Sequence, residues 1–226
     1  MTYPTIDFAS LWRREWQIKQ QNKVQWLYPL VLFLIIITLF PLAMGTEPKL
    51  LKQLGVPAVW IAAVLSLIMG MDNLFRPALD NGTLAQLIVA RASLPQWVLV
   101  RLAVHWLTSA GMVAMLSFLA MPLFGLTGQE SVALCASIVV GSPILLCLSA
   151  IASSLTLSLK SGAVLVPLIA LPMQLPVLIF ATGAVGQFAM GMNGLPILAL
   201  LLAGSIFAVI ATPFVIAYSL KLAWLS

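Results

Sequence analysis

The sequence predicts an all-α polytopic membrane protein with six transmembrane helices. Residues 161–220 contain no charged side chain. About 20 apolar residues are enough to cross a hydrocarbon core of ~30 Å, so this segment holds two crossings. Further segments upstream are equally free of Asp, Glu, Lys and Arg. The composition agrees, because 62% of the 226 residues are hydrophobic and only 8% are charged.

Helices, and not the strands of a barrel, are the expected spanning elements. Backbone amides in lipid must be satisfied within the protein, and continuous apolar runs such as residues 30–40 lack the alternation of barrel strands. The last two spans are separated by Gly-Met-Asn-Gly at residues 191–194. The whole chain, residues 1–226, is therefore expected to form one transmembrane domain. The predicted spans cover residues 26–44, 54–72, 96–123, 131–158, 162–183 and 196–220.

The positions of the cations predict that both termini are cytoplasmic. Nine of the 11 Lys and Arg residues fall on the side that carries the termini, whereas Lys49 and Lys52 fall on the other side. Basic residues beside a span are retained in the cytoplasm far more often than they are translocated. The net charge of +5 follows from this asymmetry. Because the cations are spread over helix ends, no nucleic-acid partner is expected.

Residues 1–25 are expected to form an interfacial helix and not a cleavable signal peptide, because they lack an apolar core with a small-residue cleavage site. Leu11, Trp12 and Trp16 share one helical face, which suits a helix lying among lipid head groups. Glu15 is the exception on that apolar face. The alternative is a solvated tail.

The connection between the second and third spans, residues 72–96, is long enough to have structure of its own. A turn signal is followed by Thr83, which can cap a helix, and by an apolar stripe at helical spacing. This stripe must lie on the membrane or on another protein. The sequence has no Gly-rich loop with a lysine to cradle nucleotide phosphates, which favours docking on a separate ATPase. The residues expected to couple the chain to an ATPase are Asp80, Gly82, Thr83, Leu84, Leu87, Ile88 and Arg91.

Ionisable groups are scarce in the predicted spans, which argues against several classes of function. Secondary carriers normally need a carboxylate or an ion pair near mid-bilayer, and the spans offer neither. The spans also lack paired carboxylates, a nucleophile with its base, and a set of metal ligands. The chain is therefore not expected to be catalytic or to bind a metal.

Some side chains in or near the spans are candidate contacts with haem or with a partner. His105 is the one titratable side chain clearly inside a span, and both packing and haem ligation remain open for it. Residues 184–196 are apolar but too short to cross, so a re-entrant or interfacial segment is expected there. Three prolines in the fifth span free backbone carbonyls and suggest a wall that faces a partner. The candidate contacts are His105, Gln174, Met190 and Met192.

Seven segments of the sequence are similar to one known family. They are residues 28–42, 45–51, 59–65, 74–76, 80–84, 105–106 and 171–181. With these segments the chain resembles, nearly end to end, the CcmB family of permease subunits of the bacterial cytochrome c maturation transporter, also called the haem exporter. Ala85 stands where the family commonly has Glu, and Pro77 stands at a usually acidic position. No acidic contact with an ATPase is therefore carried over.

The resemblance implies a half-transporter of the type-2 ABC exporter kind in the bacterial inner membrane. It would pair with a second copy and with CcmA-like ATPase subunits, next to CcmC-like and CcmD-like membrane subunits. A periplasmic haem chaperone, similar to CcmE, would be an indirect partner. No cofactor is expected in the chain itself, since haem is the implied substrate of the complex and ATP binds the partner subunit.

Two mechanisms remain open. In the first, the chain couples ATP hydrolysis to haem delivery or to release of the haem-loaded chaperone. The scarcity of cationic and haem-ligating side chains along the spans favours this mechanism. In the second, haem or another amphipathic substrate passes through the chain itself.

Overall fold

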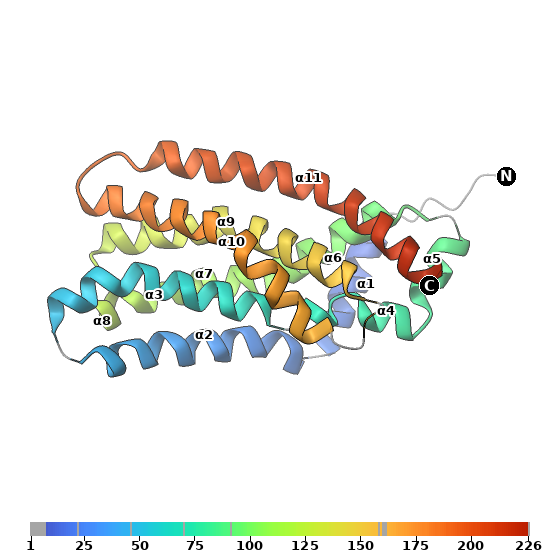
Figure 1. Cartoon of the computed structure of the whole chain (residues 1–226), viewed down its shortest axis with the longest axis horizontal. Coiled ribbons are helices and arrows are strands. Elements are labelled where there is room, and N and C mark those ends of the chain that lie inside the picture. Colours follow the sequence, from blue (N-terminus) through green and yellow to red (C-terminus); the bar gives the residue numbers. More distant parts are fainter. Residues whose placement is uncertain are drawn as a thin grey trace.

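The computed structural model describes residues 8–21, 23–45, 47–69, 71–90, 92–157, 159 and 162–225. Within these residues every regular element is a helix, and the helices form an elongated bundle (Figure 1). Six helical segments are long and apolar enough to cross a membrane, which confirms the predicted all-α, six-span fold. These segments are Leu27–Met44, Pro48–Ile68, Leu94–Phe124, Gly128–Leu155, Val164–Ala189 and Leu195–Trp224.

The third span is interrupted, whereas the others are continuous helices. Hydroxyl groups of Thr108 and Ser109 donate to backbone carbonyls at the interruption, including that of His105. The third span consists of α6 (Leu94–Thr108), α7 (Ala110–Leu116), the 3-10 helix η2 (Ser117–Leu119) and α8 (Ala120–Phe124). The other spans are α2 (Lys23–Met44), α3 (Pro48–Ile68), α9 (Gly128–Leu155), α10 (Gly162–Ala189) and α11 (Leu195–Leu225).

The central helix is α9, which packs against α3, α7, α10 and α11. Gly141 lies so close to Trp60 that an added Cβ would come within 2.9 Å of the indole ring. Trp60 also donates its Nε1–H to the Ser137 hydroxyl at 3.1 Å, and Trp106 donates to Ser142 at 2.9 Å. Small residues and interhelical hydrogen bonds are the usual means by which helices associate in lipid. The sequence of α9 therefore explains its central place.

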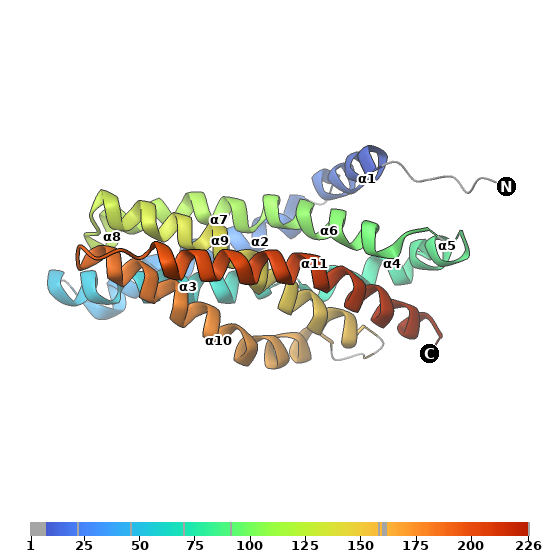
Figure 2. The same cartoon turned by 90° about the horizontal axis from the view of Figure 1, so that it is seen from above.

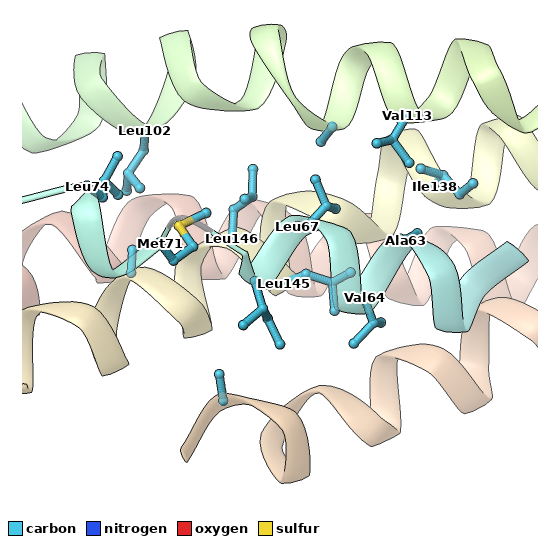
Figure 3. Close-up of a cluster of buried hydrophobic side chains, with 14 of the residues drawn as sticks. Ala63, Val64, Leu67, Met71, Leu74, Leu102, Val113, Ile138, Leu145 and Leu146 are labelled. Atoms are coloured by element: carbon cyan, nitrogen blue, oxygen red, sulfur yellow. The ribbon is translucent and has the colours of Figure 1, made fainter. Parts of the chain in front are cut away.

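An apolar cluster fills the space between α3, α6, α7 and α9 (Figure 3). Leu67 of α3 and Met71 of the 3-10 helix η1 (Met71–Asn73) lie beside Leu146 of α9. Leu102 and Val113 join the cluster from the third span. These side chains hold the two halves of the third span against α3 and α9.

One end of the bundle carries both the N-terminal helix and the last turns of the chain. Helices α1 (Phe8–Gln21), α4 (Arg76–Asp80) and α5 (Thr83–Val89) lie at this end with the C-terminal turns of α11 (Figure 1). The loops that join α2 to α3, α8 to α9 and α10 to α11 lie at the opposite end. We call these the terminal end and the loop end.

The second span begins earlier than the sequence predicts. Helix α3 starts at Pro48 and not at residue 54, so Lys49 and Lys52 belong to its first turns. Proline suits the first turn of a helix, because its missing N–H has no partner there in any case. The Nζ of Lys52 lies 3.5 Å from a carboxylate oxygen of Glu130 at the start of α9. A long lysine stem can thus lie along an apolar helix end while its charge remains paired.

The prediction of a separate re-entrant segment at residues 184–196 is wrong. Residues 184–189 continue α10, and α11 begins at Leu195. The chain reverses at Gly191, whose φ of +72° favours glycine. Gly194 then lies so close to α10 that an added Cβ would clash with the Ala184 carbonyl oxygen. The apolar character that suggested a separate segment belongs to the last turns of α10.

Candidate functional site at the terminal end

Helix α1 is anchored on α6 by a buried carboxylate. Glu15 is 5% exposed, and its Oε1 accepts a hydrogen bond from Trp97 Nε1 at 2.9 Å. Its Oε2 lies 3.1 Å from the guanidinium of Arg101. Leu11 is also buried, and Figure 2 shows α1 on the outer side of α6. For residues 8–21 the alternative of a solvated tail is wrong, and the residue that interrupts the apolar face is the one that fixes the helix to the bundle.

Arg101 joins three parts of the chain. Its guanidinium pairs with Glu15 of α1, and its Nε donates to the carbonyl of Leu74 at 2.7 Å. Leu74 lies between η1 and α4, in the segment that leads to α5. The guanidinium also stacks 5.0 Å from the ring centroid of Trp97 on its own helix. One side chain of α6 therefore links α1 to the connection between the second and third spans.

A cavity of about 770 Å³ lies beside this link, within the size range of small-molecule sites. Helices α1, α2, α3, α6 and α10 contribute to its wall, together with η1. Its polar lining is formed by Glu15, Lys19, Tyr28, Asn73, Arg101 and His105. The rest of the lining is almost entirely apolar. The cavity thus combines a charged corner with an apolar wall.

His105 and Lys19 form a pair in this charged corner. The Nζ of Lys19 lies 2.8 Å from Nδ1 of His105, which is 6% exposed. Burial, and then the positive charge of Arg101, lower the pKa of Lys19 to about 8. The other ring nitrogen of His105, Nε2, is buried and has no hydrogen-bond partner among the described residues.

The connection between the second and third spans folds as two short helices, α4 and α5, which we call the elbow. Gly82, with a φ of +74°, is the N-cap of α5, so the expected capping role of Thr83 is wrong. The side-chain oxygen of Asn81 accepts the Thr83 N–H at 3.0 Å instead. Asp80 is exposed on the same turn, and Arg91 lies outside the described residues.

The apolar stripe of α5 is covered within the chain itself. Leu84 and Leu87 are 1% and 5% exposed, and α5 packs against α4 and α11. Ile88 is half-buried and contacts the same core. The expectation that this stripe must lie on the membrane or on another protein is therefore wrong. The outward side of α5 carries Gln86 and Val89, and Val89 is 74% exposed.

The remaining candidate contacts do not lie together. Gln174 is buried between α10 and α9, where its Nε2 donates to the Leu145 carbonyl at 2.9 Å and to the Ser149 hydroxyl at 2.7 Å. It therefore does not belong to an exposed wall. Met190 and Met192 are exposed in the connection between α10 and α11, at the loop end, whereas His105 belongs to α6, which begins at the terminal end (Figure 1). Within the described part of the chain, no group of three or more His, Cys, Asp or Glu side chains can hold a metal ion.

Sequence analysis missed the contributions of α1 to the cavity. Lys19 and Glu15 both lie on the side of α1 that meets α6. Lys19 contacts His105 and Glu15 contacts Arg101, and each pair is 86 positions apart in sequence. The available signal was Glu15 itself, because a carboxylate on an apolar face needs a buried partner. Arg101 of α6 is the matching cation.

Comparison with known proteins gives a consistent family. A family model described as CcmB protein matches residues 6–223. Heme exporter protein B of Haemophilus influenzae is 36% identical over 215 residues, which cover 95% of this chain and 97% of that protein. Heme exporter protein B of Pseudomonas aeruginosa is 34% identical over 215 residues, with 95% and 96% covered. The Escherichia coli K12 protein of the same name is 35% identical over 218 residues, with 95% and 98% covered.

Proposed function

Because this chain belongs to the CcmB protein family, we propose that it is the transmembrane permease subunit of an ATP-driven complex in c-type cytochrome biogenesis. Its similar proteins bear the name heme exporter protein B. The chain would couple ATP hydrolysis on a separate subunit to haem delivery, or to release of a haem-loaded periplasmic chaperone. Its place is the bacterial inner membrane, with the terminal end in the cytoplasm.

The observation that supports coupling most directly is the contact between Arg101 and Leu74, which lies just before the elbow. A displacement of α4 and α5 would move the Leu74 carbonyl. The hydrogen bond of 2.7 Å between this carbonyl and Arg101 would transmit the movement to α6. Arg101 in turn holds Glu15 of α1 and lines the cavity. A contiguous chain of buried contacts of this kind can carry a displacement from a docking site to a distant part of the molecule.

The proposed partners follow from the family and from the exposed side of the elbow. Asp80, Gln86 and Val89 present a surface at the terminal end, where an ABC ATPase subunit similar to CcmA would dock. A second copy of the chain and membrane subunits similar to CcmC and CcmD would complete the complex. A chaperone similar to CcmE would receive or release haem at the loop end.

The cavity supports a second candidate function, in which haem itself passes through the chain. Lys19 of α1 lies beside Arg101 and His105 of the third span, and together they supply two cationic groups and a ring nitrogen. An anionic tetrapyrrole needs such groups as well as an apolar wall. Export of another amphipathic substrate fits the same lining.

Reconstitution distinguishes the two candidates. If the chain couples, vesicles carrying the chain and its ATPase should hydrolyse ATP without accumulating haem, and chaperone release should require the full complex. If the chain exports, the same vesicles should accumulate haem when ATP is added. In cells, deletion of the chain should abolish c-type cytochromes, and re-expression should restore them. Normal cytochrome levels in the deletion strain would contradict both candidates.

The proposed orientation predicts the outcome of reporter fusions. Alkaline phosphatase folds only outside the cytoplasm, so a fusion after Ser226 should be inactive and one at Asn193 should be active. The physical reason is that nine of the 11 cations lie on the side of the termini. High activity after Ser226 would show that the terminal end faces the periplasm.

A further inference from the structure

The hydrogen bond between Lys19 and His105 fixes which ring nitrogen carries the proton. An ammonium group has donors only, so Lys19 Nζ donates and His105 Nδ1 accepts at 2.8 Å. A neutral imidazole has one donor and one acceptor, and Nε2 is therefore the donor. With a pKa of about 8, Lys19 is mostly protonated at neutral pH, which keeps this arrangement.

The Nε2–H of His105 is thus a buried donor that the described part of the chain leaves without an acceptor. A buried donor that stays unpaired is unfavourable, because it has lost its hydrogen bonds to water. His105 lines the cavity, so an acceptor on a bound molecule can satisfy it. Because Nε2 presents a proton and not a lone pair, this ring is arranged to receive an oxygen atom and not a metal ion.

The charges in the same corner favour a negatively charged oxygen. Glu15 is the one carboxylate among the described side chains that line the cavity, and both its oxygens are engaged, by Trp97 and Arg101. Its charge is balanced by Arg101. The ammonium of Lys19 has no such counter-ion, because its described partner is the neutral ring of His105. Among the described side chains, the corner therefore carries one uncompensated positive charge beside an unpaired donor.

The rest of the cavity suits an apolar body that arrives from the bilayer. Apolar side chains of α2, α3 and α10 line it, among them Leu32, Ile68 and Leu171. Tyr28, Leu65 and Met69 also line it while being 54%, 40% and 45% exposed. Tyr28 and Leu65 belong to helices that are long and apolar enough to cross a membrane, so exposed side chains of two spans form part of the rim of the cavity. In Figure 2 the N-terminal half of α10 diverges from the rest of the bundle at the terminal end.

We propose that this cavity binds an amphiphile with an anionic head group, a carboxylate or a phosphate, held by Lys19 and the Nε2–H of His105 at the edge of the bilayer. The apolar body of the ligand lies along α2, α3 and α10. This inference goes beyond the proposed coupling function, since it holds whether or not a substrate crosses the chain. The head group comes from an anionic phospholipid or from a free dicarboxylate such as a tetrapyrrole.

The test uses the full chain in nanodiscs of phosphatidylcholine, with metal-free protoporphyrin IX and its neutral dimethyl ester as probes. Wild type should bind the diacid at least tenfold more tightly than the ester. Lys19→Gln and His105→Phe should each weaken binding of the diacid about tenfold, whereas Lys19→Arg should retain it. Lys221→Gln is the matched control, because Lys221 is an exposed cation at the same end of the bundle and should not affect binding.

A pH series adds a second measurement. Between pH 7 and pH 9 Lys19 loses its proton, so binding of the diacid should weaken as the pH passes about 8. The polar and charged groups around Lys19 in the cavity are Glu15 on α1, Arg101 and His105 on α6, Tyr28 on α2 and Asn73 on η1. Binding by the Lys19→Gln variant should not change over this pH range, and the pH dependence of wild type would then be assigned to Lys19.

Nanodiscs that contain phosphatidylglycerol identify the source of the head group. Retention of phosphatidylglycerol by wild type in native mass spectrometry, lost in Lys19→Gln, would assign the site to a lipid. Binding of the diacid without retention of the lipid would assign it to a free dicarboxylate. Equal affinity of wild type for diacid and ester would overturn the proposal, as would full binding of the diacid by Lys19→Gln or no binding of either amphiphile. Lys19→Arg is the control for folding, because it keeps the positive charge and should retain binding. Loss of binding in both Lys19 variants would also overturn the proposal.

Discussion

Replacing Arg101 with methionine is expected to release α1 from the bundle. The substitution leaves Glu15 buried without its cation, and removing one partner of a buried ion pair costs about 3–5 kcal/mol. It also removes the hydrogen bond to the Leu74 carbonyl and the stacking on Trp97. The purified variant should unfold at a lower temperature in detergent, and limited proteolysis should cut within α1.

The double variant Glu15→Leu with Arg101→Met is the control for this prediction. It removes both charges, so no carboxylate is stranded, and apolar replacements of a buried pair are often neutral for stability. Most of the lost stability should return in the double variant, while the link to the elbow stays broken. If Arg101→Met alone were as stable as wild type, the pair would not anchor α1.

The six-span fold follows from hydropathy because each span is specified locally. The spans predicted to start at residues 131 and 196, for example, begin within three residues of the starts of α9 and α11. The predicted boundaries of a span are wrong where the ends of the helix are not specified by local hydropathy. The start of α3 at Pro48 was missed because Lys49 and Lys52 pointed to a loop, and the sequence does not show that Lys52 pairs with Glu130 of α9. The end of α10 extends to Ala189 because an apolar helix can project past the predicted membrane boundary.

The candidate site was harder to predict, because its groups come from different helices. His105 was identifiable from its place in a span, but its partner Lys19 is 86 positions away in sequence. From the sequence, Arg101 is a cation at a helix end. Its role is visible only in the structure, where its guanidinium pairs with Glu15 of α1. The fold thus brings Lys19 of α1 next to groups of the third span, and hydropathy alone does not show this arrangement.

The elbow shows the opposite error. Leu84 and Leu87 follow a helical period correctly, but the period alone cannot tell whether the apolar side meets another protein or the same chain. The C-terminal turns of α11 cover these side chains. A surface for the ATPase must therefore be sought on the other side of α5.

Replacing Val89 with aspartate is expected to separate the chain from its ATPase without unfolding it. Val89 is 74% exposed, so a carboxylate there remains hydrated in the isolated chain. In the proposed complex the same carboxylate would be buried at the docking surface without a partner. Such a charge typically costs about 2–5 kcal/mol, which is a loss of affinity of roughly 30-fold or more. Co-purification of the ATPase and cytochrome c maturation should both be lost.

Two further variants separate docking from folding. Val89→Thr keeps the shape of the side chain without charge and should retain the ATPase. Leu87→Asp places a carboxylate at a position that is 5% exposed, so the chain itself should lose stability and accumulate poorly. This contrast also explains why substituting Leu87 and Ile88 would not test docking cleanly, since both contact the core of this chain.

If Val89→Asp retains its ATPase, the exposed side of α5 is not the docking surface. The ATPase must then contact α1, whose Arg13 and Arg14 are exposed at the same end, or the segment between α9 and α10.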